Sequence, residues 1–222
     1  MAAGMRRAWP LALIVAVLLV AVAACGGKEA APRPLTDADL RQMVVITSSG
    51  LPWQLVSQGD SAKSTEQAAN DFADPETWLQ KYQDWGRTGG HAADFGLSGS
   101  DTGAVQTQVE AYASVAGAKS AFSALSDFMS SDAWPRTLEG QGFAAVTVNK
   151  VNAPKVGDAA VTFAAAVISG GQRFDTFIVV FRRGAVLATV SLGAASGGEA
   201  SADGVAAIAA QLDSRVKDIL NQ

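Results

Sequence analysis

The sequence predicts an α+β fold in which an antiparallel β-sheet of about five to six strands is covered by helices, including a C-terminal helix. Two kinds of pattern support this prediction. Segments in which apolar and polar residues alternate are typical of strands, and segments with an apolar residue every three to four positions are typical of helices. These segments follow one another in the order β-β-α-β-β-β-β-α. The chain carries no glycine-rich phosphate loop of the βαβ type, so we expect a single α+β domain rather than a parallel sheet.

Two helices are expected before the sheet. A short one follows Thr36, which together with Asp39 can cap the helix start. Asp74 and Pro75 mark a clearer start, because Asp accepts hydrogen bonds from free amides and Pro is tolerated at the first helical position. The second helix carries three aromatic residues on one face, and Gly86 is expected to end it. The three residues are Trp78, Tyr82 and Trp85.

Six strands are then predicted, and their ranges are 91–97, 104–113, 143–151, 160–168, 173–181 and 186–192. The strand at 173–181 has large apolar residues at successive positions, which indicates burial on both faces and a central place in the sheet. In 104–113, Gln106, Gln108 and Glu110 share one face, so we expect that face to lie in water. A helix is predicted over 115–129, and the last one presents an apolar stripe between 205 and 219.

The N-terminal region is typical of a secretory signal peptide. Arg6 and Arg7 precede an uncharged run over 9–24, which is shorter than the roughly 20 residues needed to cross a bilayer. The run ends in Val22-Ala23-Ala24-Cys25, and Cys25 is the only cysteine. This ending resembles the lipobox of bacterial lipoproteins. The resemblance implies that residues 1–24 are removed and that Cys25 is acylated, which would anchor the protein to the cell membrane on its extracytoplasmic side.

A flexible tether over 25–34 and a single domain over 35–222 are expected after the signal peptide. Loss of Arg6 and Arg7 leaves 15 basic against 21 acidic residues, which disfavours nucleic acid as a partner. With its only cysteine acylated, the mature chain has no thiol for disulfide or redox chemistry.

The aromatic stripe and the loop after it are the candidate binding residues. Trp78, Tyr82 and Trp85 could form a platform for a carbohydrate or hydrophobic ligand, or they could anchor their helix to the core. Arg87 could clamp an anionic group, or it could offset the helix dipole. His91 is the only histidine and lies in no catalytic motif. No metal-ligand spacing is found either, so we expect no catalytic residue, metal or cofactor.

The order of elements over about 90–222, the export signal and the size together resemble exported α/β/α sandwich lipoproteins of the PsbP/Mog1-like type. That resemblance implies a non-enzymatic module that binds a ligand or a partner protein, or that assists assembly. Its partner would be an envelope protein or a small hydrophobic ligand. Two alternatives stay open, namely an envelope hydrolase with an acidic site and a carrier of a lipid or other hydrophobic molecule. A cavity of several hundred Å³ lined by Val, Phe and Ala would favour the carrier.

Overall fold

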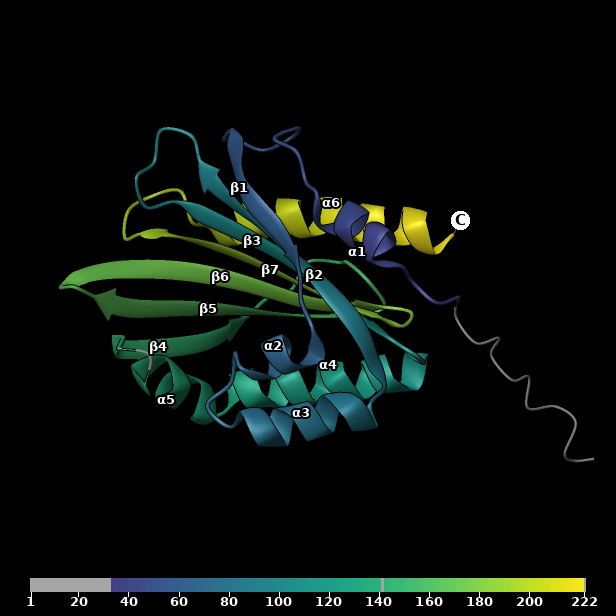
Figure 1. Ribbon diagram of the computed structural model, residues 1–222. Coiled ribbons are helices and arrows are strands. Elements are labelled where there is room, and N and C mark those ends of the chain that lie inside the picture. Colours follow the sequence, from purple (N-terminus) through teal and green to yellow (C-terminus); the bar gives the residue numbers. More distant parts are fainter. Residues whose placement is uncertain (1–32, 141, 222) are drawn as a thin grey trace, which may run out of the picture. The chain divides into compact units, whose positions relative to one another are not determined.

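The computed structural model describes residues 33–140 and 142–221, and these form a mixed α/β fold around one antiparallel sheet (Figure 1). The expected signal peptide, the lipidation site Cys25 and most of the expected tether lie outside the described residues. The sheet has seven strands in the order β1-β2-β3-β7-β6-β5-β4. The strands are β1 (Leu55–Ala62), β2 (Arg87–Leu97), β3 (Ala104–Tyr112), β4 (Ala144–Val151), β5 (Ala159–Ser169), β6 (Gln172–Arg183) and β7 (Val186–Ala195).

The predicted fold class is confirmed, and the strand count is slightly higher than expected. The additional strand is β1, which forms one edge of the sheet and is exposed along most of its length. Its sequence, LVSQGDSA, lacks the alternation of apolar and polar residues that marks a half-buried strand. An edge strand with so little burial therefore leaves no pattern in the sequence.

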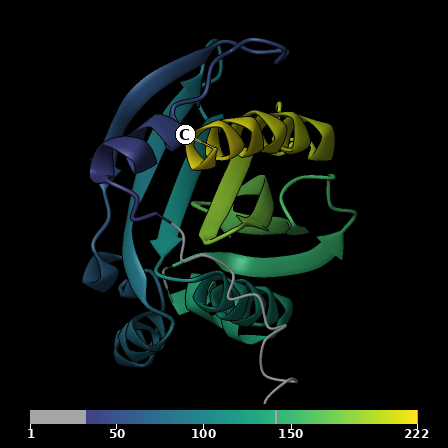
Figure 2. The same ribbon diagram turned by 90° about the vertical axis from the view of Figure 1, so that its right-hand side faces the viewer.

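Helices cover both faces of the sheet (Figures 1 and 2). Helices α1 (Asp37–Val44) and α6 (Ala202–Leu220) pack on one face, which we call the α6 face. The opposite face, here called the α4 face, carries α2 (Thr65–Ala69), α3 (Pro75–Asp84), α4 (Val115–Ser130) and α5 (Ala133–Gly140). Within the described residues, no helix is long and apolar enough to cross a membrane.

Each face has its own apolar core, and strand β6 contributes to both. Val179 and Phe181 are fully buried in the core of the α6 face, whereas Val180 is fully buried in the core of the α4 face. Strand β6 pairs with β5 on one side and with β7 on the other. The prediction of burial on both faces is confirmed for the second half of the strand, whereas Phe174, Phe177 and Ile178 are only half-buried. Strand β6 is an interior strand, next to the middle strand β7.

The helix starts also agree with the sequence signals. Thr36 and Asp39 form a reciprocal capping box at α1, and the Asp74 side chain accepts a hydrogen bond from the Thr77 amide at α3. Arg33 donates to Asp39 and to the carbonyl oxygen of Ile219, at 2.9 and 3.0 Å. The last residues of the expected tether therefore already contact α1 and α6.

Candidate ligand-binding site

The α4 face changes from polar to apolar across the sheet. Strand pairing places Gln106 of β3 opposite Ser191 of β7, and Ser191 opposite Ile178 of β6. Ile178 in turn lies opposite Phe163 of β5. Because directly paired residues point to the same face, this one row runs from amide and hydroxyl groups to an aliphatic and an aromatic side chain.

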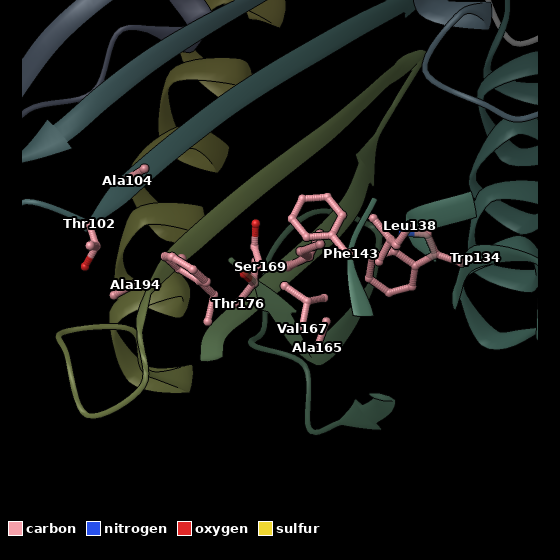
Figure 3. A pocket seen from close by; sticks show the side chains of 13 residues that line it. Thr102, Ala104, Trp134, Leu138, Phe143, Ala165, Val167, Ser169, Thr176 and Ala194 are labelled. Carbon is pink, nitrogen blue, oxygen red and sulfur yellow. The ribbon is translucent and has the colours of Figure 1, made fainter. Parts of the chain in front are cut away.

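At the apolar end of this face lies a pocket of about 340 Å³, which we call the α5 pocket (Figure 3). Trp134 and Leu138 of α5 lie on one side of it beside Phe143, and Thr102, Ala104 and Ala194 lie on the other. Five large apolar side chains that line it stay half-buried, and these are Leu138, Phe143, Val167, Phe174 and Ile178. A hollow of this size, lined in this way, is typical of a site for a small ligand.

Two further hollows adjoin the α5 pocket on the same face. One, of about 270 Å³, shares Trp134, Leu138 and Ile178 with it and continues toward Gln108 and Glu110. The other, of about 480 Å³, shares Ala104, Thr176 and Gly193 with it. The three hollows share lining residues and therefore adjoin one another, and together we call them the trough. Its apolar end lies at α5 and its polar end over β2, β3 and β7.

The aromatic stripe lies mainly inside the core of the α4 face. Trp78 and Tyr82 are each 5% exposed, and Trp85 is half-buried at the C-terminal end of α3. Trp78 stacks on Phe72 with ring centroids 3.7 Å apart. Tyr82 also lines the 270 Å³ hollow, and burial, with the charge of Glu110 added, raises the pKa of its hydroxyl well above the ordinary value.

Arg87 is buried at the start of β2 and is engaged by the protein itself. Its guanidinium donates to the carbonyl oxygen of Lys63 and the hydroxyl of Thr65, at 3.1 and 3.3 Å. It also lies 3.5 Å from the Glu110 carboxylate and 5.4 Å from the centre of the Tyr82 ring. The structure thus brings Arg87 together with the stripe, but within a closed polar cluster.

Glu110 departs from the expectation that its face of β3 lies in water, because it is only 4% exposed. Tyr112 donates to one of its carboxylate oxygens and Gln108 to the other. Burial, together with the nearby charge of Glu110, raises the pKa of Tyr112 far above its ordinary value. Along this face of β3, Gln106 is exposed to solvent, whereas Glu110 is buried.

His91 lies in a structural contact near α1. Its ring nitrogens lie 3.2 Å from Asp37 Oδ1 and 2.8 Å from Asp60 Oδ1, and the ring is almost fully buried. The hydrogen bond from His91, and to a smaller extent that from Arg41, holds the pKa of the Asp60 carboxyl below its usual range. In the part of the chain that the structure describes, no group of three or more His, Cys, Asp or Glu residues is arranged to hold a metal ion.

The residues of the α5 pocket were not singled out by the sequence. Trp134 and Leu138 are four positions apart, as expected for one face of a helix, but the eight-residue helix α5 was not predicted. Phe143, Val167 and Phe174 look like ordinary strand residues. Only the packing of α5 beside β4 to β6 brings these side chains around one hollow.

Comparison with known proteins supports the architecture. No protein family and no curated protein matches the sequence. Among solved structures, the chain is similar to the extracellular domain of PknH from Mycobacterium tuberculosis, with a TM-score of 0.50 and 11% sequence identity. The match covers 86% of this chain and 99% of that domain. At this identity the likeness concerns the fold alone, so the lipobox and the PsbP/Mog1-like resemblance stay predictions.

Proposed function

We propose that this protein is a membrane-anchored lipoprotein of the cell envelope whose α+β domain binds a small hydrophobic ligand. The observation that carries this proposal is the α5 pocket, a hollow of about 340 Å³ in which five large apolar side chains are half-buried. A ligand that covers these side chains removes their apolar surface from water, and this is favourable by roughly 25 cal/mol per Å² of apolar area. The Val, Phe and Ala lining favours a hydrophobic ligand over a flat protein partner.

The proposed location rests on the N-terminal sequence. The uncharged run that ends at Cys25 supports export and acylation, and anchoring on the extracytoplasmic side follows from both. The structural neighbour is itself an extracellular domain, and this agrees with an exported fold. We propose binding rather than catalysis, because His91 is packed against Asp37 and Asp60 and lines none of the three hollows.

A matched pair of substitutions on β5 tests the pocket. Val167 lines the α5 pocket, whereas the next residue, Ile168, points to the opposite face and is 36% exposed. Val167→Trp should fill the hollow, and Ile168→Trp should leave it open. We expect the fluorescence of N-phenyl-naphthylamine to rise with the wild-type domain and with Ile168→Trp, but not with Val167→Trp. Equal binding by both variants would contradict the proposed site.

A further inference from the structure

The charged residues that line the trough are all acidic. The charged residues that line the three hollows are Asp71, Asp94 and Glu110, and among the described residues no Lys or Arg lines any of them. Because a carboxylate repels an anion at close range, this lining disfavours ligands with a carboxylate or phosphate head.

Two of these three carboxylates are already engaged by the protein. Glu110 is buried and accepts hydrogen bonds from Gln108 and Tyr112, and it lies beside Arg87. Asp71 forms an ion pair with Lys63. Asp94 differs, since it is exposed and accepts a hydrogen bond from the neutral side chain of Gln106, at 2.9 Å. Over the described ranges, Asp94 has no cationic side chain within ion-pair distance.

Strand pairing connects Asp94 to the apolar pocket. Asp94 lies opposite Gln106, and Gln106 lies opposite Ser191, so a carboxylate, an amide and a hydroxyl follow one another across three strands. All three line the 480 Å³ hollow, and the next residue in the row, Ile178, lines the α5 pocket. A molecule with its chain in the α5 pocket can therefore place its head beside Ser191, Gln106 and Asp94.

We infer that the trough binds a single-chain amphiphile with a cationic ammonium head, and this rests on the proposed function of the α5 pocket. The apolar chain occupies the α5 pocket, and the ammonium group donates hydrogen bonds to the Asp94 carboxylate and the neighbouring side-chain oxygens. Charge complementarity at Asp94 gives the selectivity, while the chain supplies the affinity that is common to all amphiphiles of the same length.

Three ligands with the same chain and different heads test this inference by calorimetry below their micelle concentrations. We expect nonylammonium to bind tightest, decanoylglycerol to bind roughly two- to fivefold more weakly, as one solvent-exposed ion pair allows, and decanoate to bind weakest. All three carry the same nine-carbon alkyl chain. The advantage of nonylammonium should shrink as salt is added. Equal affinities, or tightest binding of decanoate, would overturn the inference.

A substitution at Asp94 locates the selectivity. Asp94→Asn should bring nonylammonium down to the affinity of decanoylglycerol and leave decanoylglycerol unchanged. Asp203→Asn, which removes an exposed carboxylate from α6 on the other face, should leave all three affinities as in the wild type. An unchanged preference in Asp94→Asn would also overturn the inference. If none of the three amphiphiles binds and N-phenyl-naphthylamine also fails to bind, the proposed function itself is wrong.

Discussion

The guanidinium of Arg87 lies 3.5 Å from the carboxylate of Glu110, and the two side chains are 0% and 5% exposed. The pair joins the first residue of β2 to β3, and Glu110 lines the 270 Å³ hollow. Tyr82, Tyr112 and Gln108 close the cluster around it. A charge in this place depends on its partner, since water cannot replace the lost contact.

Removing one member of this pair should therefore destabilise the domain strongly. We expect Arg87→Met to lower the free energy of unfolding by about 3 to 5 kcal/mol, because it leaves Glu110 buried without its cation. The exposed pair of Arg173 and Asp175 is the control, and Arg173→Met should cost under about 1 kcal/mol. Urea unfolding measures both. Similar losses for the two variants would show that the buried cluster has no special role.

The aromatic stripe should contribute stability in proportion to its burial. Trp78 is buried and stacks on Phe72, so Trp78→Ala should cost about 3 to 5 kcal/mol, as aromatic deletions in cores do. Trp85→Ala should cost less, because that ring is half-buried at the helix end. Thermal melts of the two variants check this order. An unchanged melting temperature in Trp78→Ala would point instead to a surface platform.

Acid should weaken the contact between α1 and the edge of the sheet. Hydrogen bonds from His91 and, to a smaller extent, from Arg41 hold the pKa of the Asp60 carboxyl below its ordinary value in the folded protein. A carboxyl group with a lowered folded pKa contributes stability above its unfolded pKa, and loses it as the pH falls through the folded value. The melting temperature of the wild type should therefore drop below about pH 4, and Asp60→Asn should flatten this drop. Parallel curves for the two proteins would contradict this role of Asp60.

The sequence predicted those parts of the fold whose burial repeats along the chain. Strand β6 and helix α6 carry regular apolar patterns, and the structure places both as expected. Strand β1 could not be predicted in this way, because an exposed edge strand needs no apolar alternation. Helix α5 was missed because eight residues are too few to establish a periodicity. Helix α1 has the same length and was predicted from its cap at Thr36 and Asp39, not from a periodicity.

The candidate site was hidden for a different reason. The α5 pocket is formed by side chains from α5, from the segment around Phe143, and from β5, β6 and β7, which are far apart in the sequence. Each residue alone looks like part of a core. The burial of Glu110 was missed in a similar way, since its partner Arg87 was expected in a loop and begins strand β2 instead.

The most direct test of the account is the place where a hydrophobic ligand attaches to the protein. A decyl chain that carries a diazirine can be bound to the wild-type domain, photolysed, and located by mass spectrometry of the peptides. We expect adducts on the residues of the α5 pocket, above all on α5 near Leu138 and on β5 near Val167, and we expect Val167→Trp to abolish them. Adducts on the α6 face, or adducts that persist in Val167→Trp, would contradict the claim that this pocket is the ligand-binding site.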